Sequence, residues 1–269
     1  SEAQFAYRAS ANVTSLFPPR GSVHGGTPVT VLGARFTPYS ATMQCRFGST
    51  APVPAQRRSA GELVCIAPPH AAGAVAVTVT DLNSADVALA PTPFTYVANA
   101  SVSRLDPRMG PVAGGTRVLV FGANFVRSPE LRCRFGAAGV VAATWLNATC
   151  VQCTSPSFAA AGAVALEVSN NDAEFTGDQV QFAVHAALAV TALVPSLGPA
   201  AGGTVVNITG GPFAPYRLRC LFGAATAPVI AVYISASLIQ CTTPAAPIGA
   251  TLPLAAWLRI ANNGADYSA

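Results

Sequence analysis

Short stretches of alternating apolar and polar residues recur along the chain, and Gly or Pro interrupts them before a helical period can develop. The clearest stretches follow three Gly-Gly-Thr sequences. Val29 and Val31 would share one face of a strand and Thr30 the opposite face. The same alternation is found at two later places, at Val118 and Val120 around Leu119, and at Val206 and Ile208 around Asn207. Short strands between turn signals predict an all-β sandwich.

The chain contains three copies of one pattern, P-x-x-G-x-x-x-G-G-T. The copies end at Thr27, Thr116 and Thr204, so the threonines are 89 and 88 residues apart. This period is too long for a solenoid unit and suits a sandwich domain of about 100 residues. We expect repeats at residues 11–98, 99–187 and 188–269. The junctions between them hold no Gly/Ser-rich or Pro-rich spacer, which favours a stiff head-to-tail rod.

The two ends of the chain suggest a segment of a longer array. Residues 1–10 contain the sequence QFAY, which matches the closing strands FTYV at Phe94 and VQFAV at Val180. We therefore expect residues 1–10 to be the closing strand of a preceding repeat. By the same alignment, repeat 3 would lack its last strand.

Six of the seven cysteines form pairs at a constant offset. The members of each pair are 20, 20 and 21 residues apart, and the first is always followed two residues later by Phe: Cys45 and Cys65, Cys133 and Cys153, Cys220 and Cys241. Such a pattern predicts one disulfide per repeat, with buried free thiols as the alternative. Closing a loop of this length stabilises a domain by about 3 kcal/mol. The Phe should pack into the core beside the bridge.

Cys150 has no counterpart in the other repeats. Alternation makes it face away from Cys153, and a zinc site at C-V-Q-C would need two further ligands that the chain does not supply at comparable spacing. A free thiol, an intermolecular bridge and an exchanged pairing with Cys133 all remain open.

Composition points to the secretory route. Charged residues are 10% of the chain, well below the roughly 25% of an ordinary soluble domain, and the net charge is +4. No apolar run approaches the ~18 residues of a membrane span. Four N-x-[ST] sequons would let glycans keep such a surface soluble: Asn12, Asn99, Asn147 and Asn207. Disulfides and N-glycans share the extracellular compartment.

Candidate chemistry is sparse, so we expect no catalytic residues, metal site or cofactor. No spacing links His24, His70 or His185 to a nucleophile. The Gly-Gly-Thr loops lack the Lys and the following helix of a phosphate-binding loop. Asn and Asp recur at matched turns, at Asp81 and Asn83, Asn170 to Asp172, and Asn262 and Asn263. A hairpin turn explains them as well as calcium does.

Two groups of residues could form an interaction surface. The first is made of arginines near the first cysteine of repeats 2 and 3: Arg132, Arg134, Arg217 and Arg219. A solvated face, an acidic partner and a neighbouring domain are the alternatives. The second is the outward-facing pair Leu119 and Phe121, which could pack against another chain or domain. Nucleic acid is not expected, because neither Lys nor a basic loop cluster accompanies the arginines.

The pattern P-x-x-G-x-x-x-G-G-T, followed by C-x-F-G and C-x-x-P, resembles the IPT/TIG domain in three copies that cover nearly the whole chain. The resemblance implies immunoglobulin-like sandwiches. Its extracellular members carry such domains in tandem as stalks, and the paired cysteines match that branch. We therefore interpret the chain as a non-catalytic adhesion and protein-interaction segment of a cell-surface glycoprotein. The alternatives are a Rel-like DNA-binding region and an accessory region of a polysaccharide-active enzyme.

Overall fold

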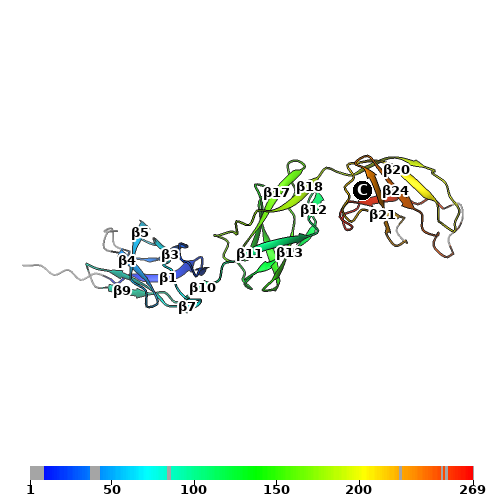
Figure 1. Ribbon diagram of the computed structural model, residues 1–269. Coiled ribbons are helices and arrows are strands. Elements are labelled where there is room, and N and C mark those ends of the chain that lie inside the picture. Colours follow the sequence, from blue (N-terminus) through cyan, green and yellow to red (C-terminus); the bar gives the residue numbers. More distant parts are fainter. Residues whose placement is uncertain are drawn as a thin grey trace, which may run out of the picture.

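A computed structural model describes residues 9–36, 43–83, 86–223, 226–249, 251 and 254–268. In these ranges the chain is all-β, with no helix, and it forms three successive sandwiches. Figure 1 shows them in chain order in one extended row, from blue through green to red. The predicted fold class, three tandem β-sandwiches arranged head to tail, is therefore confirmed.

Repeat 2 shows the architecture most completely. One long strand, β15, pairs with β16 through Ala143–Asn147 and with β14 through Val140–Ala142, and so connects the two layers. The first layer contains β11 (Ser101–Asp106), β13 (Arg117–Ala123), β16 (Cys150–Thr154) and β15 (Val140–Asn147). The second contains β14 (Arg132–Phe135), β17 (Gly162–Ser169), β18 (Val180–His185) and β12 (Met109–Pro111).

Repeat 1 follows a similar strand order with two differences: the counterpart of β17 is divided into β7 and β8, and an extra strand, β9, pairs with β8. One layer contains β1 (Asn12–Phe17), β3 (Pro28–Ala34), β6 (Glu62–Ile66) and β5 (Val53–Ser59). It continues through β5 into β4 (Met43–Phe47), β8 (Val77–Asp81) and β9 (Asp86–Leu89). The closing strand β10 pairs in parallel with β2 and antiparallel with β7: β2 (Arg20–Ser22), β7 (Gly73–Val75), β10 (Phe94–Val97).

Repeat 3 repeats both layers up to β25, its last described strand. The first layer contains β19 (Ala189–Val194), β20 (Val205–Gly211), β24 (Leu238–Thr242) and β23 (Val232–Ser235). The second contains β22 (Val229–Ile230), β21 (Arg219–Phe222) and β25 (Leu258–Ala261). The strand expected within residues 1–10 falls mostly outside the described residues.

The cores form where the alternating pattern placed them. Val29, Val31, Val118, Val120 and Ile208 are fully buried. In each repeat a disulfide joins the two layers: Cys45–Cys65, Cys133–Cys153 and Cys220–Cys241. These are the pairs that the constant offset singled out, and their burial beside the layer interface explains why the offset recurs.

The Phe that follows each first cysteine is buried in two repeats. Phe47 packs edge-on against Phe94 at a centroid distance of 5.3 Å, and Phe135 packs against Phe182 at 5.5 Å. Phe222 stays partly exposed, because the described part of repeat 3 provides no closing-strand ring to cover it. Phe222 nevertheless packs against the core of repeat 3, which contains Cys220 and Cys241, so the expected packing of the Phe beside the bridge is found in all three repeats.

Cys150 is a free, buried thiol with 7% exposure. It lies opposite Phe121 in the ladder between β13 and β16, on the face away from Cys153. The guanidinium of Arg104 stacks 3.5 Å from the centre of the Phe121 ring. Burial raises the pKa of the Cys150 thiol, while Arg104 acts in the opposite direction. An exchanged bridge from Cys133 to Cys150 is wrong, because Cys133 is bonded to Cys153.

The Gly-Gly-Thr motif is explained by space as well as by backbone conformation. Both Gly114 and Gly115 have positive φ, at 76° and 83°. A Cβ on Gly114 would lie 2.3 Å from the backbone oxygen of Pro156, whereas a Cβ on Gly115 would meet nothing within 4 Å. A Cβ on Gly110 would lie 2.2 Å from the hydroxyl of Thr116, so the glycines of the motif leave room around this threonine.

Replacing both cysteines of repeat 2 (Cys133→Ala with Cys153→Ala) should lower its free energy of unfolding by about 3 kcal/mol, because the loop between them would no longer be closed. The measurement is denaturant unfolding followed by Trp145 fluorescence. Cys150→Ala is the control and should cost much less. An equal loss in both variants would contradict a stabilising bridge.

Gly114→Ala should destabilise repeat 2 more than Gly115→Ala. The second substitution carries the strain of positive φ, about 1 kcal/mol, whereas the first adds a clash with backbone that cannot easily move. Denaturant midpoints of the two variants test this. Equal midpoints would show that φ alone explains both glycines.

Candidate functional site: the joints between repeats

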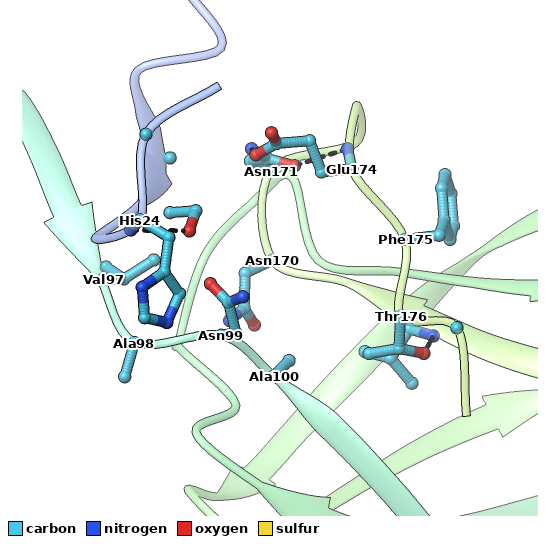
Figure 2. Close-up of a pocket in the computed structure, with 15 residues that line it drawn as sticks. His24, Val97, Ala98, Asn99, Ala100, Asn170, Asn171, Glu174, Phe175 and Thr176 are labelled. Carbon is cyan, nitrogen blue, oxygen red and sulfur yellow. Dashed lines mark hydrogen bonds between the residues drawn. The ribbon is translucent and has the colours of Figure 1, made fainter. Parts of the chain in front are cut away.

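Connected polar clusters lie where one repeat meets the next. At the first joint, the loop after β17 of repeat 2 reaches the Gly-Gly-Thr end of repeat 1. Figure 2 shows this loop beside His24, beside Val97 at the end of β10 and beside the linker that runs to Ala100, with Asn171 and Glu174 at its tip. The elements enclose an open hollow of about 380 Å³.

Two side chains of this loop bind repeat 1 directly. The Nδ2 of Asn171 donates to the backbone oxygen of Arg20 at 3.0 Å. The hydroxyl of Thr27 donates to Oε2 of Glu174 at 2.9 Å. The same carboxylate oxygen accepts from Asn171 Nδ2 at 3.1 Å, so Asn171, Glu174 and Thr27 form one connected network. Within the loop, Asn171 Oδ1 accepts from the amide of Glu174 at 2.9 Å and holds the tip in shape.

The second joint reproduces these bonds with repeat 3 in the role of repeat 2. The Nδ2 of Asn263 donates to the backbone oxygen of Met109 at 2.9 Å, and the hydroxyl of Thr116 donates to Oδ2 of Asp266 at 2.5 Å. Asn263 Nδ2 also donates to this carboxylate at 2.7 Å, and Asn263 Oδ1 accepts from the Asp266 amide at 2.9 Å. We call each set of Asn, acid, Thr and carbonyl a latch.

Burial makes the latch residues selective for one another. Thr27 and Thr116 are fully buried, and Asn171 and Asn263 are only 3% and 2% exposed. A buried polar group that loses its partner pays a desolvation cost of about 1–3 kcal/mol. In the docked arrangement each latch gives these buried donors and acceptors partners from the adjoining repeat.

The asparagines that precede Asn171 and Asn263 in the sequence bind within their own repeat. Asn170 Oδ1 accepts from the amide of Val126 at 3.0 Å, and its Nδ2 donates to Asn124 O at 2.8 Å. Asn262 makes the equivalent pair of bonds within repeat 3, to Ala214 and Pro212. The first asparagine of each pair thus holds the loop on its own repeat, and the second binds the preceding repeat.

Ion pairs add to both joints, with opposite polarity. At the first joint Arg20 of repeat 1 lies 3.6 Å from Glu130 of repeat 2. At the second, Asp106 of repeat 2 accepts from both Nη atoms of Arg217 of repeat 3, at 2.5 and 3.1 Å. This hydrogen bond raises the pKa of Arg217. The acid is therefore in the following repeat at one joint and in the preceding repeat at the other.

An aromatic contact belongs to the second joint. The guanidinium of Arg108 lies 4.8 Å from the centre of the Tyr216 ring, and the amide of Arg108 donates to the Tyr216 hydroxyl at 3.4 Å. Arg108 comes from the same P-x-x-G segment that provides the Met109 carbonyl to the latch. Repeat 3 thus contacts one short segment of repeat 2, from Asp106 to Met109, through an ion pair, an aromatic ring and the latch.

The arginines singled out in the sequence do not form one open basic face. Arg132 pairs with Asp172 at 3.4 Å, and Arg134 stacks 4.3 Å from the Phe175 ring. Arg219 is half-buried on β21. Arg217 is the one of the four that contacts a neighbouring repeat through a bond found in the described residues.

The apolar pair Leu119 and Phe121 is less exposed than the alternation suggests. Both residues are half-buried on β13. The Phe121 ring is covered by Arg104 at 3.5 Å. The apolar area that this pair offers to a second chain is therefore smaller than the sequence implies.

All four sequon asparagines, Asn12, Asn99, Asn147 and Asn207, are exposed. His24 lines the hollow at the first joint, His70 stacks on Tyr96 at 4.9 Å, and His185 Nδ1 lies 2.9 Å from the Ala186 carbonyl. Within the described ranges, no three His, Cys, Asp or Glu side chains gather as metal ligands would. Nor does the described chain contain a helix of the length and hydropathy needed to cross a membrane.

Sandwiches of this topology, crosslinked between layers and joined end to end, define a class of modular immunoglobulin-like proteins. The family model for the IPT/TIG domain matches residues 11–96, 100–184 and 188–263. The chain belongs to this family.

Relatives lie among large proteins with such domains. Plexin-A2 of Mus musculus is 30% identical over 169 residues, which are 58% of this chain and 8% of that protein. Fibrocystin-L of Homo sapiens is 33% identical over 124 residues, which are 44% of this chain and 3% of that protein. The chain thus spans less than a tenth of either relative. With the three disulfides, these relatives identify the chain as an extracellular segment.

Solved structures give more distant similarities. The full extracellular region of plexin A4 aligns with a TM-score of 0.46 at 16% identity, covering 89% of this chain and 21% of that one. A protein from a mixed-linkage glucan utilization locus of Bacteroides ovatus, solved with a heptasaccharide, aligns with a TM-score of 0.28 at 11% identity, covering 87% of this chain and 66% of that one.

Sequence reasoning missed the latch, although a signal was present. The sequences NNDAE at Asn170 and NNGAD at Asn262 share an acid three residues after the second Asn. Repeat 1 has Leu82 at the position of that second Asn, and Leu82 is 59% exposed. The turn of repeat 1 therefore lacks the second Asn that the turns of repeats 2 and 3 share.

Thr116→Val should weaken the second joint by about 1–2 kcal/mol, because the Asp266 carboxylate would lose a buried donor while side-chain volume is kept. Trp145 and Trp257 report on the two repeats that share this joint, so fluorescence-detected denaturation measures the loss.

Thr204→Val is the matched control for this experiment. Thr204 ends the same motif in repeat 3 but is partly exposed. Its replacement should change the denaturation midpoint little. Equal effects of the two variants would assign the threonine a role inside its own repeat and none in the joint.

Proposed function

We propose that the chain is a non-catalytic extracellular stalk, whose latched joints keep successive interaction surfaces at fixed spacing and orientation. The observation that carries this proposal is the bond-for-bond agreement of the two latches. If the repeats only touched one another incidentally, the two joints would not be expected to use the same four groups: an Asn, an acid, a Thr and a backbone carbonyl.

The linkers add a second constraint. Residues 98–100 separate β10 from β11, and residues 186–188 separate β18 from β19. Three residues span at most about 11 Å, so the ends of successive repeats must remain close. A short tether and a buried polar network together limit rotation at each joint, and this limit distinguishes a stalk from a flexible chain of domains.

The relatives support a role in protein interaction. Plexins and fibrocystin-L carry IPT/TIG domains in very long chains, of which this segment would be a small part. In such a chain the segment would space other domains and present strand edges and loops to protein partners. We further propose that these protein interactions serve cell adhesion.

The two alternatives are less well supported. A DNA-binding region inside the cell would keep its cysteines reduced, whereas each repeat here contains a disulfide. A polysaccharide site would need an exposed aromatic platform. Trp145 instead donates its Nε1–H to Phe125 O at 3.0 Å and is half-buried. Trp257 is exposed, but it lies in repeat 3 and has no counterpart in the other repeats.

Spin labels on repeats 2 and 3 should give one narrow distance distribution in the unmodified chain. Asp106→Arg should broaden it, because two guanidinium groups would then meet across the joint. Arg217→Asp added to Asp106→Arg restores an opposite pair and should narrow the distribution again. The measurement is pulsed electron–electron distance spectroscopy on the whole chain.

Labels across the first joint are the control, because Asp106→Arg leaves Arg20 and Glu130 in place. Their distribution should not change. A broad distribution in the unmodified chain at both joints would overturn the stalk.

A further inference from the structure

Repeat 3 exposes an apolar sheet face that repeat 2 does not have. Val194, Val205 and Val232 are 62%, 54% and 60% exposed on the layer formed by β19, β20, β24 and β23. Isolated exposed apolar residues are common, but a contiguous group needs an explanation. At the centre of this group lies Asn207, which is exposed and begins the sequon Asn207-Ile-Thr209.

The strand register places the three valines around Asn207. Val194 lies directly opposite Asn207 on β19. On the other side Asn207 lies opposite Gln240, and Gln240 lies opposite Val232. Val205 precedes Asn207 by two residues on the same face. All three valines therefore lie within about 10 Å of Asn207 along the sheet, about the length of two sugar rings.

The equivalent face of repeat 2 is polar at most of these positions. In the same register Asp106 lies opposite Leu119, Leu119 opposite Gln152, and Thr144 opposite Gln152. Arg117 replaces Val205. At the five equivalent places repeat 1 has Phe17, Pro28, Thr30, Val64 and Gln56, and Phe17 is 48% exposed. The repeat with an Asn at the centre is the one with three valines around it.

The side-chain amide of Asn207 is held through its oxygen. Its Oδ1 accepts a hydrogen bond from Gln240 Nε2 at 2.8 Å. This bond uses the oxygen and not the Nδ2 that an N-linked glycan occupies, and it fixes the rotation of the amide. A glycan on Nδ2 would begin on the valine-rich face and leave the Gln240 bond intact.

From these observations we propose that Asn207 carries an N-linked glycan whose first sugars cover the valine-rich face of repeat 3. The apolar C–H faces of N-acetylglucosamine rings would pack on Val194, Val205 and Val232, while their hydroxyls face water. This inference goes beyond the stalk proposal and does not depend on it. Of the earlier conclusions, it requires only the extracellular location.

The modification is a group transfer from a lipid-linked oligosaccharide diphosphate. A bond forms between Asn207 Nδ2 and C1 of the first N-acetylglucosamine, and the bond between C1 and the diphosphate oxygen breaks. The lipid diphosphate leaves with the electron pair, and one amide proton is released. No oxidant or reductant is involved. The transfer can occur before folding, so the folded face needs only to accommodate the product.

The chain secreted from glycosylating eukaryotic cells tests both parts of the proposal. Enzymatic release of glycans in heavy-oxygen water marks each formerly occupied Asn, and peptide mass spectrometry should find the mark at Asn207. An unmodified Asn207 in the secreted chain would overturn the inference.

The covering role is tested by binding of a fluorescent hydrophobic dye and by mass measured in solution. Asn207→Gln and Thr209→Ala remove the same sequon in two ways, and both should raise dye binding roughly twofold or more. Asn147→Gln removes a sequon from the exposed end of β15 and is the matched control. Equal dye binding by Asn207→Gln and Asn147→Gln would overturn the covering role.

A compensating variant separates surface exposure from partial unfolding. Val205→Arg with Val232→Thr introduces the residues that repeat 2 has at these positions. Added to Asn207→Gln, it should return dye binding to the original level, whereas dye binding that stays high would contradict the inference. A dimer of the glycosylated chain that Val205→Arg dissociates would also contradict it, because a second copy would then be the cover.

Discussion

The hydrogen bond from a buried threonine of one repeat to a carboxylate of the next is the constraint on which the joints depend. Thr27 and Thr116 are fully buried, so each hydroxyl proton needs an acceptor, and that acceptor is a carboxylate of the next repeat. The preceding glycines leave the space for each hydroxyl. A motif that maintains the turn inside one domain therefore also creates the contact between domains.

Local patterns predicted the sandwiches well, because burial of a strand follows from its own residues. The alternation around Val118 and Val120, the offset between Cys133 and Cys153 and the turn glycines all act within one repeat. The latch could not be predicted in this way. Asn171 and Thr27 are 144 residues apart, and only the docked geometry gives the Asn–acid spacing a meaning. The cover over Phe121 could not be predicted for a similar reason, because Arg104 comes from a different strand to lie on the ring.

Covalent and non-covalent restraints act at different levels in this chain. The disulfides connect the two layers inside each sandwich, where a small core gives limited stability by itself. The latches, ion pairs and short linkers connect one sandwich to the next. Loss of a bridge would therefore affect one repeat, whereas loss of a latch would affect the angle between two folded repeats.

The opposite polarity of the two ion pairs has a consequence for the order of the repeats. If repeat 3 were docked on repeat 1, Arg217 would occupy the place of Glu130 and meet Arg20. If a second copy of repeat 2 were docked on the first, Glu130 would meet Asp106. Both permutations bring like charges together beside an otherwise compatible latch. The charge pattern therefore favours the order in which the three repeats follow one another, because a reordered array would place like charges at a joint.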